Sequence, residues 1–248
     1  YLYFIKGIES LPPRSWETDY DLTLRLNIEC GEAGYLNGRQ AEAETYFKQV
    51  MIQSRNVLDR IRIYEVRIAW QVMQFHPEES IRIGTEALRL LGISMPARTS
   101  IPRILVEMLK VGVFQSFTRI ERMADQVSMT DPEKLAVMRL LMSIAEPCYL
   151  ANPAYLPVVI CRMIVLTFRH GVSQFSSFAF AAYGLLLCGV FNRFTKGFIF
   201  GKTALDLIQR YPDSPLRARV LYLYGNMISL WKRHIRESYP YQIGRAHV

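Results

Sequence analysis

The chain has 248 residues, of which 50% are hydrophobic and 21% are charged, and its formal net charge is +8 at pH 7. This composition excludes an intrinsically disordered chain, and the length allows a sizeable core in one domain or in an elongated array. The positive charge favours an acidic partner, although the basic residues are spread along the chain. We interpret their densest group, Lys232-Arg233-His234 with Arg236, as a solvated helix end, with a binding patch as the alternative.

Both ends of the chain look internal to a longer polypeptide. The chain opens inside an apolar run without an initiating Met, and residues 243–248 resemble a translated sequencing adapter. We therefore expect residues 1–10 to be the end of a preceding helix and residues 238–248 to be a tail.

Residues 21–55 predict a helical hairpin. Apolar or small residues recur at helical spacing in two sets, Leu22, Leu26, Cys30 and Ala33, then Ala43, Phe47 and Val50. A short turn at residues 36–38 separates the two sets and contains Gly38, the residue type that most often ends a helix. Gly31 and Ala43 are small, so the two helices can approach each other closely.

Further helices follow in chain order, separated by Pro, Gly and Ser. Residues 56–74 and 77–91 predict a second hairpin, and residues 94–102 a linker. After the linker we expect helices over residues 103–115, 120–127, 132–146, 154–170, 175–191, 193–210 and 216–237. No segment alternates with the period of a strand, so the predicted fold class is all-α. We expect the first two helical hairpins over residues 16–92 and further helical hairpins of the same array over residues 93–237.

A faint internal repeat supports one stacked array. The spacing Ala43-x3-Phe47-x2-Val50 recurs with other residues at 80–87 and at 197–204. Its period resembles that of tetratricopeptide repeats, although the repeat's Trp is absent and its Tyr is shifted to Tyr35. We therefore expect a tetratricopeptide-like right-handed superhelix. The residues expected to pack between its helices are Gly31, Gly38, Ala43, Phe47, Gly84, Ala87, Gly197, Gly201 and Ala204.

No set of residues predicts a catalytic, cofactor or metal site. Gly201-Lys202-Thr203 resembles part of a phosphate-binding loop, but the preceding Gly197 is one residue too close and the segment reads as helix. The histidines lack the spacing of metal ligands. Residues 173–192 carry no charge, yet their Ser, Gln and Asn residues favour a buried helix over a membrane span.

Cysteines and aromatic residues fit a packed interior. The four cysteines form no CxxC pair, and we predict buried, reduced thiols in a cytoplasmic protein. The aromatic residues between 175 and 200 are expected in the core, with a groove for a peptide or small ligand as the alternative.

An ordered set of motifs resembles one region of large bacterial multidomain signalling kinases. The motifs are WETDYDLTLRLNIECGEAGYLNG, EALRLLGI, MTDPEKLAVMRLL, FRHGVSQFSSFAFAAYGLLL and GFIFGKTAL. In that family a Ser/Thr-kinase-like domain and a P-loop ATPase precede a helical repeat region, and GAF and histidine-kinase domains often follow. The resemblance lies wholly in the helical region, where none of the family's catalytic motifs occurs.

The resemblance implies a non-catalytic segment that relays signals or binds partners inside a sensor kinase. ATP and Mg²⁺ would belong to the parent's other domains. The expected partners are those domains and a peptide or small-molecule ligand, with neither nucleic acid nor a membrane among them. The alternatives are the regulatory arm of an ATPase-type transcription activator and a free-standing peptide-binding adaptor.

Overall fold

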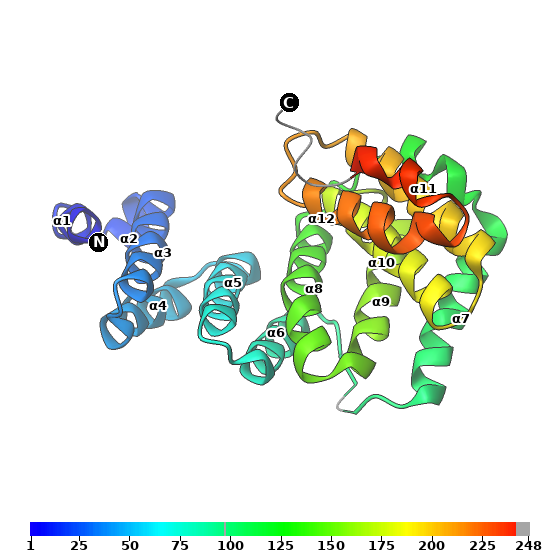
Figure 1. Cartoon of the computed structure of the whole chain (residues 1–248). Coiled ribbons are helices and arrows are strands. Elements are labelled where there is room, and N and C mark those ends of the chain that lie inside the picture. Colours follow the sequence, from blue (N-terminus) through cyan, green and yellow to red (C-terminus); the bar gives the residue numbers. More distant parts are fainter. Residues whose placement is uncertain (97, 242–248) are drawn as a thin grey trace. The chain divides into compact units, whose positions relative to one another are not determined.

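The structure is a computed structural model that describes residues 1–96 and 98–241, and only the backbone of residues 238–240. The described residues are helical apart from turns and one isolated bridge between Ser128 and Val172, which confirms the all-α fold class (Figure 1). The chain divides into two compact units, Tyr1–Met95 and Pro96–Val248. The adapter-like residues 243–248 lie outside the described residues, and the right-handed superhelix stays a prediction.

The first unit is built from short helices and two helical hairpins. Its helices are α1 (Leu2–Glu9), α2 (Ser15–Thr18), α3 (Tyr20–Leu36), α4 (Gln40–Gln53), α5 (Val57–Met73) and α6 (Pro77–Leu90). Gly38 takes a φ of +71° in the turn between α3 and α4, a conformation that glycine adopts without strain. The Asn56 side chain accepts a hydrogen bond from the Asp59 N–H and so caps α5, while Pro77 occupies the first turn of α6.

The core of the first unit lies between α3, α4 and α5. Its buried side chains are Leu24, Ile28, Tyr35, Ala43, Phe47, Val50 and Ile63. The predicted apolar face of α4 is therefore correct, but that of α3 is partly wrong, because Leu22 is exposed and Leu24 and Ile28 are buried instead. Since helical positions two residues apart point in different directions, the buried face of α3 is rotated from the predicted one.

The second unit packs longer helices around a larger core. Its elements are α7 (Ile101–Phe117), η1 (Ile120–Asp125), α8 (Pro132–Ala151), η2 (Pro153–Tyr155), α9 (Leu156–His170), α10 (Gln174–Gly189), α11 (Phe194–Gln209), α12 (Arg217–Tyr222), η3 (Leu223–Ile228), η4 (Ser229–Trp231) and η5 (Ile235–Tyr241). Helices α10 and α11 form a hairpin, and α9 packs against α7, α8 and α10. The Asp131 carboxylate caps α8 by accepting hydrogen bonds from the N–H groups of Glu133 and Lys134.

Two predicted helix ends in this unit are wrong. Helix α8 continues through Pro147 to Ala151, although proline removes one helical hydrogen bond. Ile144, Ala145 and Cys148 are almost completely buried, so their packing holds the chain helical across the proline. Residues 216–237 form no continuous helix, because α12 ends at Tyr222 and widens into the π-helical turn η3.

Candidate functional site

Three of the predicted packing residues, Gly31, Ala43 and Phe47, lie where α3 meets α4. A Cβ atom built on Gly31 would lie 2.7 Å from Cζ and 2.9 Å from Cδ1 of the buried Phe47 ring. Gly34, which the sequence analysis did not single out, faces Ala43 in the same way, with 3.0 Å between the added Cβ and that of Ala43. A Cβ atom added at Gly38 would meet no other atom within 4 Å, and Gly38 serves the turn. On α6, Gly84 and Ala87 are buried.

Close packing of glycines recurs between α10 and α11. A Cβ on Gly197 would lie 2.6 Å from the carbonyl oxygen of Gly184, another residue that the sequence analysis did not single out. Gly201 leaves room for Tyr224 and Ile228 of η3, each with an atom 2.9 Å from the added Cβ. Ala204 is fully buried on the same helix. Because Gly201-Lys202-Thr203 lies inside α11, its N–H groups belong to the helix.

A polar cavity of about 230 Å³ lies within the first unit, between its two hairpins. Arg67 of α5 reaches Glu44 of α4 at 2.5 Å, and the Tyr35 hydroxyl donates a hydrogen bond to the same carboxylate. Across the cavity, Tyr64 donates to Glu86 at 2.9 Å, and Arg82 pairs with Glu79 at 2.6 Å. These charges are already paired with each other, so the cavity offers few free groups to a ligand.

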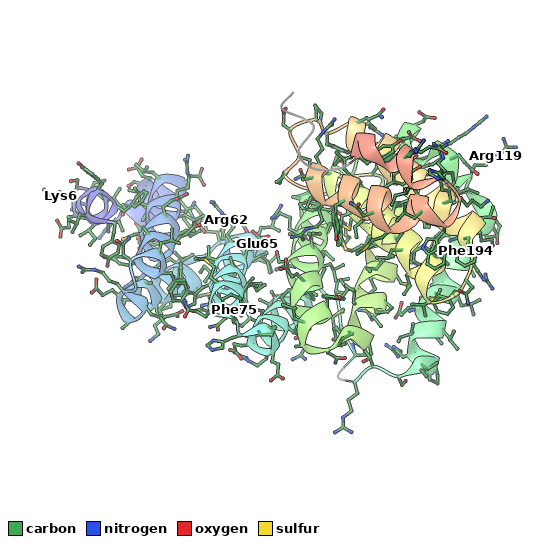
Figure 2. All side chains as sticks on the ribbon, in the orientation of Figure 1. Lys6, Arg62, Glu65, Phe75, Arg119 and Phe194 are labelled. Carbon is green, nitrogen blue, oxygen red and sulfur yellow. The ribbon has the colours of Figure 1, made fainter. Side chains whose placement is uncertain are left out.

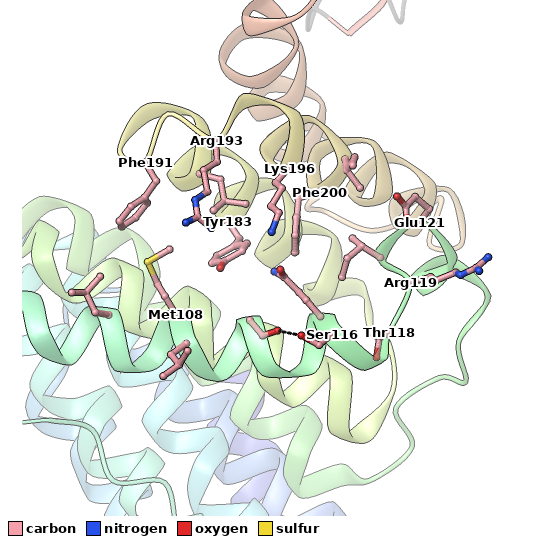
Figure 3. A pocket seen from close by; sticks show the side chains of 17 residues that line it. Met108, Ser116, Thr118, Arg119, Glu121, Tyr183, Phe191, Arg193, Lys196 and Phe200 are labelled. Atoms are coloured by element: carbon pink, nitrogen blue, oxygen red, sulfur yellow. Dashed lines mark hydrogen bonds between the residues drawn. The ribbon is translucent and has the colours of Figure 1, made fainter.

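A larger groove of about 650 Å³ opens in the second unit between α7 and the α10–α11 hairpin (Figure 3). The apolar side chains that line it come from both sides, Leu105, Met108, Leu109, Tyr183, Leu187, Phe191 and Phe200. Tyr183 and Phe200 are almost completely buried and form an edge-to-face pair with ring centroids 4.9 Å apart. Burial raises the pKa of the Tyr183 hydroxyl, so it stays a neutral phenol.

The edge of this groove is cationic. Arg119, Arg193 and Lys196 line it together with one acid, Glu121, and all four side chains are exposed. Figure 3 shows the Arg193 and Lys196 side chains on the same side as Tyr183 and across from α7, and Figure 2 shows Arg119 extending outward. Among the described residues, none of these three cations has a carboxylate within ion-pair distance.

A neighbouring cavity of about 470 Å³ shares Thr118 and Arg119 with the groove. Its charged lining is basic, and consists of Arg119, Arg122 and Arg169, with His170 beside them. Arg169 lies over the ring of Phe114 at 5.1 Å, and no aspartate or glutamate lines the cavity. The two cavities therefore form one basic region around the C-terminal end of α7.

Hydrogen bonds from α11 hold the segment that carries two of these arginines. The Thr203 hydroxyl donates to the carbonyl oxygen of Ile120 at 3.2 Å. Arg210 donates through Nη1 to the carbonyl oxygens of Ala124 and Gln126 at 2.5 and 2.7 Å, and through Nη2 to the Ser128 hydroxyl at 3.1 Å. These bonds hold the backbone on both sides of Arg122 and directly after Arg119.

The sequence analysis gave a groove at these aromatic residues only as an alternative to a packed core, and it singled out none of the groove's cations. Of the aromatic residues it weighed, Phe178, Phe180, Tyr183 and Phe200 are buried as predicted, and three of the set, Tyr183, Phe191 and Phe200, also line the groove. The sequence feature that could have indicated the cationic edge is the pair Arg193 and Lys196 at the turn between two aromatic-rich helices. All four cysteines are free and buried, as predicted.

Within the described residues, no group of His, Cys, Asp and Glu is arranged to hold a metal ion, and no helix is both long and apolar enough to cross a membrane. The predicted basic group near residue 232 is exposed, and Arg233 pairs with Glu237 at 3.2 Å. These observations identify no functional site besides the groove among the described residues.

Comparison with known proteins gives one line of support for a function. The chain is 20% identical over 244 residues to the hybrid signal transduction histidine kinase G of Dictyostelium discoideum. The alignment covers 91% of this chain but spans only 7% of the length of that relative. No protein-family model matches the chain, and no solved structure matches it. The similarity supports a signalling context and leaves the role of the segment open to proposal.

Proposed function

We propose that this chain is a non-catalytic helical segment of a larger signalling kinase, and that it binds another component of the same signalling system in the groove of the second unit. The observation that carries the proposal is an open groove with an apolar floor and a cationic edge, whose cations have no carboxylate within ion-pair distance in the part of the chain that the structure describes. In the parent polypeptide, ATP and Mg²⁺ would be bound by kinase and ATPase domains. Occupation of the groove would shift the equilibrium between states of those domains.

The similarity to a histidine kinase favours this proposal over the two alternatives. A transcription activator would carry a DNA-binding helix-turn-helix domain in the same reading frame, and a free-standing adaptor would carry no kinase domain. Histidine-kinase domains in that reading frame would support the proposal, whereas their replacement by a helix-turn-helix domain would contradict it.

The proposal is tested on the complete polypeptide encoded around this segment. Reversing two groove charges with Arg193→Glu and Lys196→Glu is expected to change how strongly autophosphorylation responds to the signal or partner. The matched control reverses two exposed charges away from the groove, Lys202→Glu and Arg217→Glu, and is expected to respond like the wild type. The proposed function is contradicted if the autophosphorylation of both double variants responds like that of the wild type.

The non-catalytic part of the proposal has its own test on the 248-residue chain. Titration with labelled ATP is expected to give no saturable binding, because the one lysine in a phosphate-loop-like segment lies inside α11. Saturable micromolar binding that Lys202→Ala abolishes would contradict this expectation.

A further inference from the structure

Helix α7 exposes an apolar stripe along its length. The stripe consists of large apolar residues at every fourth position, each with 51–86% of its surface exposed. These residues are Ile101, Leu105, Leu109, Val113 and Phe117. Such a stripe normally faces a core, and an exposed apolar patch of this extent marks an interaction surface. From Leu105 to Phe117 the stripe is about 18 Å long at the helical rise per residue.

The stripe and the basic region meet along the groove. Leu105 and Leu109 line the groove itself, and Phe117 lines the neighbouring cavity. The cations Arg119, Arg193 and Lys196 therefore border a surface that already offers an apolar track. A ligand that satisfies both features needs apolar side chains at helical spacing and negative charges beside them.

We propose that the groove of the second unit binds an acidic amphipathic helix of about four turns, supplied by a partner protein. Its apolar side chains would contact Leu105, Leu109 and Phe117, and its Asp and Glu side chains would face Arg119, Arg193 and Lys196. This inference names the chemistry of the partner in the proposed function and rests on that function.

Charge and shape favour this occupant over three others. A second copy of the chain would bring a second cationic edge and a net charge of +8 to the same surface, so charge repulsion opposes self-association. A membrane surface is broad and does not enter a groove whose floor contains the buried Tyr183 and Phe200. A small anion would leave Val113 and Phe117 exposed.

The test measures binding of synthetic helical peptides to the 248-residue chain by fluorescence anisotropy. One peptide of about 16 residues carries Leu at helical spacing and Glu on both flanks of the Leu stripe, a second has Lys in place of each Glu, and a third is a scrambled version of the first. We expect saturable binding of the first peptide and not of the basic or the scrambled peptide. Added salt should weaken this binding, because the flanking charges are exposed to solvent.

Protein variants locate the site. Arg193→Glu with Lys196→Glu is expected to weaken acidic-peptide binding by about ten-fold or more, since it replaces two attractions with repulsions. Leu109→Ser is expected to weaken binding without unfolding the protein, because Leu109 is 68% exposed. Lys202→Glu with Arg217→Glu is the matched control and is expected to bind like the wild type. Circular dichroism confirms that each variant stays folded.

Several results would overturn the inference. Equal binding of acidic, basic and scrambled peptides, preferential binding of the basic peptide, or no binding of any peptide contradicts an acidic helix as the occupant. Concentration-dependent dimerisation, or binding to phosphatidylserine vesicles, that the groove variants abolish would assign the surface to a second copy or to a membrane. If the complete polypeptide still responds to the groove charges in any of these cases, the proposed function stands and only the class of partner is wrong.

Discussion

Gly31 lies where α3 packs against the ring of Phe47, and the structure leaves no room there for a β-carbon. Phe47 is fully buried, and its ring makes an edge-to-face contact with Tyr35 at a centroid distance of 5.3 Å. A methyl group at position 31 would therefore push on a ring that is already packed in the core.

Replacing Gly31→Ala is expected to lower the free energy of unfolding by roughly 1 kcal/mol, because overpacking costs more than the gain in helix propensity. Urea unfolding followed by circular dichroism measures the change. The matched control is Gly7→Ala in α1 of the same unit, where the added Cβ would meet Leu26 at an ordinary 3.4 Å and stability should hold or rise. A Gly31→Ala protein as stable as the wild type contradicts this expectation.

The buried thiols of Cys148 and Cys161 predict a loss of stability at alkaline pH. Burial raises the pKa of each thiol from 9.0 to about 12. In the unfolded chain the thiols ionise near pH 9, whereas in the folded chain they stay protonated. Their contribution to stability is therefore fully present below pH 9 and is lost as the pH rises from 9 towards 12.

Urea unfolding at about pH 8 and about pH 10.5 tests this expectation. The free energy of unfolding should fall with pH more steeply in the wild type than in Cys148→Ala with Cys161→Ala. The double variant creates the same cavities at both pH values, so cavity formation does not enter the comparison of slopes. Equal slopes would show that the two thiols do not titrate differently on unfolding.

At the scale of elements, the short helix η1 depends on Arg210 at the end of α11. Arg210→Ala would remove hydrogen bonds to two backbone carbonyls and to Ser128, which we expect to destabilise residues 120–128 by about 1–2 kcal/mol. Amide hydrogen exchange should quicken over these residues and change little in α8. Because Arg122 lies within this segment and Arg119 directly before it, acidic-peptide binding should weaken as well.

The neighbouring exposed residue gives a control for this prediction. Gln209→Ala changes a solvent-exposed side chain on the same turn of α11 and should leave hydrogen exchange over residues 120–128 unchanged. If Arg210→Ala also leaves exchange there unchanged, the bonds from Arg210 do not hold η1.

The elements that the sequence predicted well are those bounded by local chemistry. Residues 77–91 were expected as a helix and form α6 from Pro77 to Leu90, because Pro at the start and Gly92 at the end act within a few residues. The helix through Pro147 and the π-helical turn at residues 223–228 could not be predicted in this way. Both depend on packing against residues distant in the sequence, such as Gly201 beside Tyr224.

The groove, like these two elements, depends on tertiary packing and could not be predicted from local sequence. The apolar stripe on α7 is visible in the sequence, where spacing predicts a helix with a buried face. Whether another helix of the chain covers that face depends on tertiary structure, and in the structure Leu109 and Phe117 stay exposed. The cations that border the stripe are Arg119, directly before η1, and Arg193 and Lys196 at the start of α11. Arg119 lies far from the other two along the chain, so only the tertiary structure brings them to one groove.

At the scale of the whole molecule, the second unit contains everything that the binding proposal uses. The groove and the neighbouring cavity are lined by residues between 105 and 200, and the buried core of the same unit includes Met138, Leu141 and Phe180. That core forms within residues 96–248, so this unit is large enough to fold as a domain of its own.

A chain of residues 96–248 is therefore expected to be helical, to unfold cooperatively, and to bind the acidic peptide within about two-fold of the affinity of the complete chain. Circular dichroism during thermal unfolding establishes that it folds, and fluorescence anisotropy compares the two affinities. A folded fragment that binds the peptide much more weakly would mean that residues 1–95 contribute to the site. In the fragment, Arg193→Glu with Lys196→Glu should weaken binding as much as in the complete chain, since both charges lie in the second unit.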